Sequence, residues 1–160
     1  MHAYKQVTTM SEILTPRAAT DVLSQTDFFS VLTDEQRASV SRICGRQDFP
    51  EAQPIYNHGE PAKYFYVLAE GTVRFAVGFG RRNASAGDML RRGNVFGWAA
   101  LTPAAKYRIA TASCLTPCTV LAIEGDEFLD LMEQDNALGF QVMKQLNLLI
   151  TGTLTAFAAG

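Results

Sequence analysis

Histidine and cysteine are scarce in this chain of 160 residues. Its two histidines, His2 and His58, are too few for the clusters of histidine and carboxylate ligands that metal sites in β-barrel enzymes need. Three cysteines leave one unpaired in any disulfide scheme, and Cys114 and Cys118 do not form a CxxC motif. We therefore interpret the cysteines as reduced, half-buried packing residues and expect no metal or other cofactor.

Signals of catalysis, export and membrane insertion are also missing. The chain has no GxxxxGK[ST] phosphate loop and no nucleophile elbow of the kind that serine hydrolases use. The stretch MHAYKQVTTMSEIL lacks the basic start, apolar core and cleavage site of a secretory signal, so we expect a cytoplasmic location. Polar residues interrupt the apolar tail 137–159 well short of the ~18 positions of a membrane span. The sequence thus predicts a cytoplasmic protein that is not an enzyme.

An excess of positive charge is absent as well. Fourteen lysines and arginines stand against sixteen aspartates and glutamates, which gives a net charge of −2. No overall field therefore attracts the chain to nucleic acid or to anionic lipid. We expect neither nucleic acid nor a membrane as its partner.

Apolar residues make up 48% of the chain, enough to bury one core, and helical signals lie toward both ends. Thr33 and Gln36 form a capping-box pattern, which predicts a short helix from Asp34 to about Cys44. Asp126 is a plausible cap for a second helix over GDEFLDLMEQD. A long final helix is expected to start near Asn136.

Between these helices lie short runs rich in aromatic and β-branched residues, punctuated by glycine. We expect strands in PIY, YFYVLAEG, TVRFAVGF, RIATASC and CTVLAIE, a hairpin loop in GRRNASAGD and a brief strand at Met89 and Leu90. The pattern predicts a mainly β fold, a β-barrel or jelly roll with a short N-terminal helix and a long C-terminal helix. We divide the chain into an N-terminal extension (1–26), a barrel domain with its entry helix (27–135) and a dimerisation helix (136–160).

The stretch NVFGWAALTPAAKYRIATA combines a glycine-led turn with a downstream arginine. Gly97 lets the backbone approach a ligand closely, and the four residues after it are enough for one helical turn whose free amides favour an anion. Arg108 is flanked by Tyr107 and Ile109. Arg108 either points into the barrel, where an unpaired charge is costly, or points outward into solvent.

These residues carry a resemblance to a known family. FPEAQPIYNHGEPAKYFYVLAEGTVRF, followed by GNVFGWAAL and YRIATA, resembles the cyclic-nucleotide-binding domain of catabolite-activator-type regulators. The similarity runs from about Asp27 through the final helix. It implies a cassette in which the short helix and the arginine hold a cyclic phosphate, so cyclic AMP or cyclic GMP becomes the expected ligand. The implied ligand-binding residues are Phe96, Gly97, Trp98, Ala99, Ala100, Arg108, Ile109, Ala110 and, on the final helix, Thr153.

The cassette departs from the family pattern on its sugar side. Trp98 stands where the family usually has a glutamate that binds the ribose 2′-hydroxyl, and Ile109 stands where a serine or threonine often follows the arginine. Each lost partner removes ~1 to 3 kcal/mol of binding free energy. Trp98 could stack on a base or plug the pocket, and we favour a plug or a changed ligand.

The final helix carries two apolar stripes, one for the barrel and one for a partner, which favours a homodimer. The stripes are Val142, Leu146, Leu149 and Thr153, and Met143, Ile150, Leu154 and Phe157. We therefore predict a regulatory sensor domain that binds a cyclic nucleotide or another small anionic effector and transmits the signal through a dimer helix. The alternative is a dimerisation or protein-interaction module that has lost its ligand.

Overall fold

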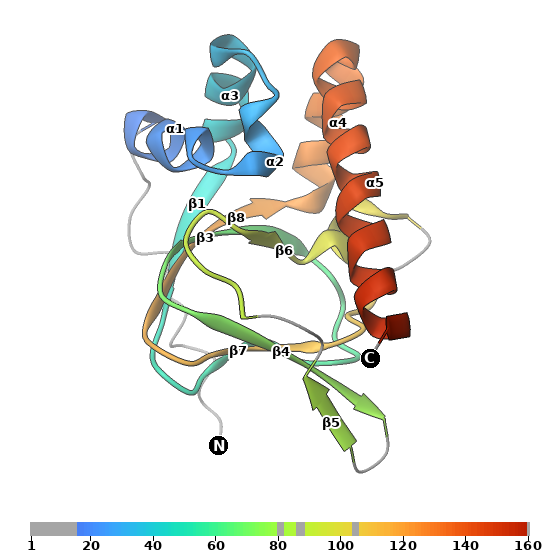
Figure 1. The fold of residues 1–160 in the computed structure, drawn as a ribbon. Helices are drawn as coiled ribbons and strands as arrows, with labels where there is room; N and C mark the ends of the chain where they lie inside the picture. Colours follow the sequence, from blue (N-terminus) through green and yellow to red (C-terminus); the bar gives the residue numbers. More distant parts are fainter. Residues whose placement is uncertain (1–15, 80–81, 86–88, 104–105, 160) are drawn as a thin grey trace.

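The computed structural model describes residues 16–79, 82–85, 89–103 and 106–159. Two four-stranded sheets form a barrel, with helices at both ends of the chain packed against it (Figure 1). Helices α1, α2, α3 and α4 gather at one end of the barrel, and α5 runs along its side (Figure 1). The helices are α1 (Pro16–Ser24), α2 (Asp27–Ser30), α3 (Asp34–Ser41), α4 (Gly125–Gln134) and α5 (Asn136–Ala159), with a short 3₁₀ helix, η2 (Trp98–Leu101).

The two sheets are antiparallel throughout, as expected of a jelly-roll-like barrel. One has the strand order β1-β8-β3-β6 and the other the order β2-β7-β4-β5. This arrangement confirms the predicted fold class. The strands are β1 (Cys44–Phe49), β2 (Pro54–Tyr56), β3 (Tyr64–Glu70), β4 (Val73–Phe79), β5 (Arg82–Ser85), β6 (Val95–Phe96), β7 (Thr111–Cys114) and β8 (Cys118–Glu124).

The capping box at the start of α3 is confirmed, because Thr33 Oγ1 accepts from the Gln36 amide and Gln36 Oε1 accepts from the Thr33 amide. The predicted end of this helix is wrong. It ends at Ser41, and Cys44 begins β1, which pairs with β8 along its whole length. The letters CGRQDF carry few apolar residues, so only the pairing with β8 identifies this strand.

The predicted loop GRRNASAGD is also partly wrong, since Arg82–Ser85 forms β5 and pairs with β4. The brief strand expected at Met89 and Leu90 is reduced to a single bridge between Leu90 and Val73. At α4 the backbone turns into the helix at Gly125, so Asp126 lies inside the first turn and is not the cap. α5 begins at Asn136 as expected.

Alternation along β3 divides the core into two clusters. Phe65 and Val67 point to the helices, whereas Tyr66 and Leu68 point into the barrel, because successive strand side chains face opposite sides. The helix-side cluster consists of Ala19, Leu23, Phe28, Phe29, Leu32, Val40, Cys44, Phe65, Val67, Val95, Leu101, Leu121, Ile123, Phe128, Met132, Leu138, Val142 and Leu146. The barrel-interior cluster consists of Phe49, Tyr56, Tyr66, Leu68, Val73, Phe96, Ala112, Cys114, Cys118, Val120 and Ala122.

Two sequence expectations concern cysteine and the apolar tail. Cys44, Cys114 and Cys118 are free thiols, and they are fully buried rather than half-buried. In the part of the chain that the structure describes, no helix is both long and apolar enough to cross a bilayer.

Candidate functional site

The site begins where β6 ends. Gly97 has a φ of 81°, in the left-handed region that glycine adopts readily, and the predicted helical turn follows as η2. A Cβ at position 97 would lie 3.0 Å from the Tyr64 carbonyl oxygen and 3.1 Å from Arg108 Nη1. Glycine is therefore required both for the backbone conformation and for the close approach of the arginine.

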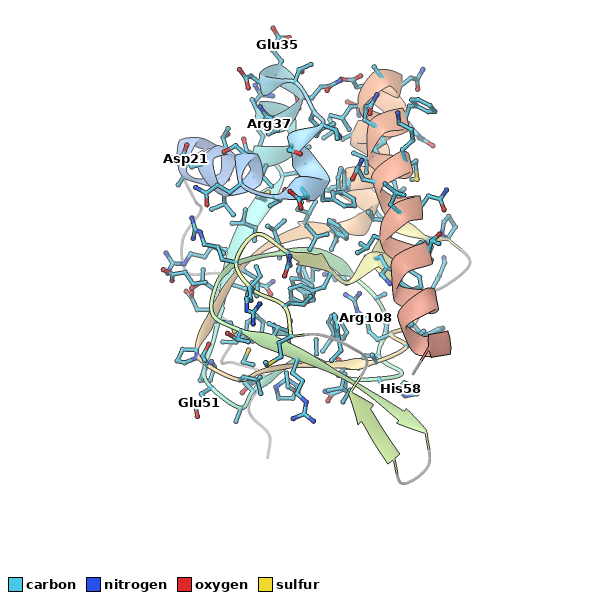
Figure 2. The ribbon with its side chains drawn as sticks, viewed as in Figure 1. Asp21, Glu35, Arg37, Glu51, His58 and Arg108 are labelled. Carbon is cyan, nitrogen blue, oxygen red and sulfur yellow. The ribbon has the colours of Figure 1, made fainter. Side chains whose placement is uncertain are left out.

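Arg108 lies inside the barrel, between the two sheets (Figure 2). Only 4% of Arg108 is exposed, whereas its neighbours Tyr107 and Ile109 are 62% and 39% exposed. The Arg108 amide donates to the Glu60 carbonyl oxygen at 2.8 Å, which fixes the backbone of this segment against the loop before β3. Of the two directions considered for the Arg108 side chain, into the barrel or out into solvent, the structure therefore shows the inward one. The arginine precedes its strand rather than entering it, because β7 starts only at Thr111.

Main-chain oxygens bind the Arg108 guanidinium. Nη1 donates to the Gly97 carbonyl at 3.0 Å, and Nη2 donates to the Tyr64 carbonyl at 2.6 Å. Nε is buried and has no hydrogen-bond partner. Among the described residues no carboxylate forms an ion pair with Arg108. The guanidinium is therefore held by main-chain dipoles and ring faces, with more distant attraction from Glu60 and no direct ion pair among the described residues.

Aromatic rings surround this cation. Cζ of Arg108 lies 4.0 Å from the centroid of the Tyr56 ring and 5.8 Å from that of Tyr66. The Tyr66 ring stacks on Phe96 at a centroid distance of 5.1 Å, and Phe75 meets Phe96 edge-on at 6.0 Å. Guanidinium groups are attracted to such ring faces, most strongly where water is excluded.

Burial is the main influence on the ionisable groups of the site. It lowers the pKa of Arg108, although attraction to Tyr56, Tyr66 and Glu60 opposes this shift. Arginine nevertheless stays charged in proteins. Burial raises the pKa of Tyr66 to about 12 and that of Tyr56 further, against the lowering effect of Arg108. Both phenols are therefore neutral at pH 7 and can donate hydrogen bonds.

Trp98 packs on the side of η2 that faces the helices. It is half-buried and packs against the helix-side cluster, not among the aromatics of the barrel interior. This placement counts against an indole plug next to Arg108. Ala99 and Leu101 of the same turn are buried, so η2 as a whole is fixed between the barrel and the helices.

The structure brings together part of the predicted site. Phe96, Gly97 and Arg108 are in mutual proximity through the contacts above, and Ala110 is buried next along the chain. Ile109 faces outward. The side chain of Thr153 lies outside the described residues, so its predicted role stays a prediction.

Sequence reasoning missed three tyrosines of the site, Tyr56, Tyr64 and Tyr66. The alternation in YFYVLAEG gave a partial signal, since Tyr64 and Tyr66 share one face of β3. Nothing local marks Tyr56, because its position depends on the packing of β2 against β7. Among the described residues no group of three or more His, Cys, Asp or Glu could hold a metal ion.

Comparison with known proteins identifies the family. Residues 46–135 match the family described as the cyclic nucleotide-binding domain. The chain is 30% identical over 110 residues to a cGMP-dependent protein kinase of Toxoplasma gondii. The aligned residues make up 68% of this chain but only 10% of that protein.

Solved structures share the fold. The catabolite activator protein of Thermus thermophilus aligns with a TM-score of 0.70 and 20% identity, covering 82% of this chain and 62% of that one. The regulatory domain of Toxoplasma gondii PKA, crystallised with cAMP, aligns with a TM-score of 0.71 and 20% identity, covering 88% of this chain and 50% of that one. The match over residues 46–135 spans more than half of the sequence, and this chain therefore belongs to the cyclic nucleotide-binding domain family.

Proposed function

We propose that this chain is a regulatory domain that binds a cyclic nucleotide, cyclic AMP or cyclic GMP, through Arg108 and transmits binding through α5 in a homodimer. The observation that carries the proposal is the buried Arg108 guanidinium, which has no ion pair among the described residues and an unpartnered Nε. A buried cation without a counter-charge is costly, and an anionic ligand removes that cost. Family membership supports a cyclic phosphate as the anion.

The route from the site to α5 is short. The Gly97 carbonyl accepts from Arg108, and the next residue, Trp98, packs on the helix-side cluster to which Val142 and Leu146 of α5 belong. An anion that binds Arg108 acts on the same guanidinium that donates to Gly97, and it thereby alters the contact at Gly97. That change reaches α5 through η2, which contacts both α4 and α5.

The faces of α5 differ from the two stripes expected from the sequence. Val142 and Leu146 are buried in the protein's own core, and Leu149 and Ile150 pack partly against it. The most exposed large apolar side chains of the described part of α5 are Phe140, Met143 and Leu148. Of these three residues, only Met143 belongs to one of the two apolar stripes expected from the sequence. A second copy that covers this face would remove apolar surface from water, which supports the homodimer.

The second candidate is a ligand-free interaction module, and one observation favours it. Both Nη atoms of Arg108 already have carbonyl acceptors, and Tyr56 covers one face, so the guanidinium serves as a cross-link without any ligand. In either case the site gives no sign of catalysis. We propose a role in the cytoplasm that involves neither nucleic acid nor membrane contact by this chain.

Isothermal titration calorimetry of the purified chain with cyclic AMP and cyclic GMP tests the proposal. Saturable binding of either nucleotide is expected, with 5′-AMP and 5′-GMP as controls for unspecific attraction of phosphate. Native mass spectrometry of the same sample reports the oligomeric state and any retained small molecule. A chain that binds neither nucleotide and carries no anion contradicts the proposal and favours the interaction module.

A further inference from the structure

Tyr56 is the closest aromatic contact of the Arg108 guanidinium. Its ring centroid lies 4.0 Å from Arg108 Cζ, so the ring covers one face of the cation. Tyr56 is the last residue of β2, a strand that contributes to the sheet opposite η2. Arg108 comes shortly before β7, which pairs with β2 in that sheet, and its guanidinium reaches across the barrel interior to the Gly97 and Tyr64 carbonyls on the side of the other sheet.

The Tyr56 ring is itself immobilised. It stacks on Tyr66 at a centroid distance of 6.0 Å and an interplanar angle of 22°, and it lies 6.2 Å from Phe96. Only 8% of Tyr56 is exposed. A ring packed in this way does not move without opening the interior cluster, because protein cores are close-packed. The Tyr56 ring therefore supports one face of the guanidinium from a fixed position.

Three contacts fix the plane of the guanidinium. The Gly97 and Tyr64 carbonyls accept from Nη1 and Nη2, and the Tyr56 ring supports the face. Nε remains as a buried donor without a partner. The guanidinium plane is therefore the direction left to an anionic ligand, and in that plane N–H groups bind phosphate oxygens with the best geometry.

We propose that Tyr56 is a positioning residue of this site, whose ring orients the Arg108 guanidinium so that its free Nε edge meets the phosphate of the ligand. The inference rests on the proposed binding of a cyclic nucleotide at Arg108. Tyr56 acts through the arginine, so its contribution is confined to the part of the affinity that depends on the phosphate. A residue that merely fills space would affect all ligands and the stability alike.

Tyr56→Leu and Tyr56→Phe separate the ring from the hydroxyl. Calorimetry with cyclic AMP and cyclic GMP should show about tenfold weaker binding for Tyr56→Leu, which corresponds to about 1.4 kcal/mol. Tyr56→Phe keeps the ring and should stay within about twofold of the wild type. Phe49→Leu is the matched control, since it removes a buried ring of the same interior cluster that makes no cation–π contact with Arg108. It should leave the affinity unchanged.

Tyr56→Leu in an Arg108→Leu background completes a double-mutant cycle. If Tyr56 acts through the arginine, Tyr56→Leu causes no further loss there, because coupled residues are not additive. An equal loss in both backgrounds overturns the inference, as does wild-type affinity in Tyr56→Leu. Should Tyr56→Leu fail to fold in thermal melts, Tyr56→Met fills the space with a flexible apolar chain and repeats the test. A wild type that binds neither nucleotide overturns the proposed function and this inference together, whereas the other outcomes leave the proposed function standing.

Discussion

Gly125, the first residue of α4, lies directly against Ala100 of η2, so that a Cβ at position 125 would overlap the Ala100 carbonyl oxygen. Helix α4 also packs against α5. The candidate site is thus connected to the long helix by a backbone contact that only glycine permits. No side chain caps the start of α4, but the Gly125 amide donates to the Lys63 carbonyl oxygen at 2.9 Å.

Gly125→Ala should destabilise the protein by about 1 to 3 kcal/mol, because an added methyl group in a filled space forces a backbone shift. The melting temperature measured by circular dichroism reports this loss. Gly152→Ala is the control, since a Cβ there has open space within α5 and should stabilise the helix by about 0.5 to 1 kcal/mol. Equal melting temperatures for Gly125→Ala and the wild type would show that the contact is loose.

Arg108→Leu should weaken binding of a cyclic nucleotide by roughly ten- to a hundredfold, since a hydrogen bond to a charged group contributes ~1.5 to 3 kcal/mol. Arg108→Lys keeps the charge but not the planar fork, so it should recover only part of the affinity. Arg74→Leu removes an exposed arginine of β4 and serves as the control. Calorimetry measures all four proteins, and undiminished binding by Arg108→Leu would place the ligand elsewhere.

Trp98→Glu should strengthen cyclic nucleotide binding, because it supplies an acceptor for the ribose 2′-hydroxyl worth ~1 to 3 kcal/mol. The 2′-deoxy nucleotides lack that hydroxyl and should gain nothing. The same variant should melt at a lower temperature, because the indole leaves the helix-side cluster. Trp98→Leu tests the packing alone. If Trp98→Glu weakens a tight wild-type complex, the indole itself recognises the ligand.

Leu148→Glu should dissociate a homodimer formed through α5, since Leu148 is 67% exposed on that helix. A buried glutamate at an apolar interface is unfavourable unless it is paired. Light scattering at micromolar concentration should report a dimer for the wild type and a monomer for the variant. Asn147→Glu adds the same charge next to it without removing an apolar side chain. Leu149→Glu is less informative, because Leu149 packs on the protein's own core. A wild type that stays monomeric up to high concentration rules the dimer out.

Stability should fall in alkaline solution. Burial raises the pKa of Cys44 from 9.0 to about 12 and that of Tyr66 from 10.0 to about 12. The folded state therefore keeps these protons after the unfolded state has lost them, so the stabilisation is complete below pH 9 and is lost as the pH rises toward 12. Cys44 contributes a slope of about 1.4 kcal/mol per pH unit above pH 9, and Tyr66 contributes a similar slope above pH 10. Urea unfolding at pH 7 to 11 measures how the free energy of unfolding depends on pH. Cys44→Ala should remove the contribution of Cys44 to that slope.

Local signals in the sequence determined several features correctly. Thr33 and Gln36 predict the start of α3, because a capping box needs only two residues three positions apart in the sequence. The alternation in YFYVLAEG predicts β3, and the small residues after Gly97 predict the helical turn of η2. The family resemblance is also carried by such contiguous stretches, and for that reason the amino-acid sequence alone is enough to recognise it.

Tertiary packing decided the rest. The strand character of Cys44–Phe49 depends on its partner β8, since the strand's own letters are too polar to indicate it. The inward direction of Arg108 depends on carbonyl acceptors 11 and 44 positions earlier in the chain, and the position of Tyr56 beside it depends on the pairing of β2 with the distant strand β7. Likewise, periodicity alone shows that α5 is apolar but not which of its faces the barrel covers. Side-chain direction in irregular segments is set by contacts between distant parts of the chain, and those contacts exist only in the folded protein.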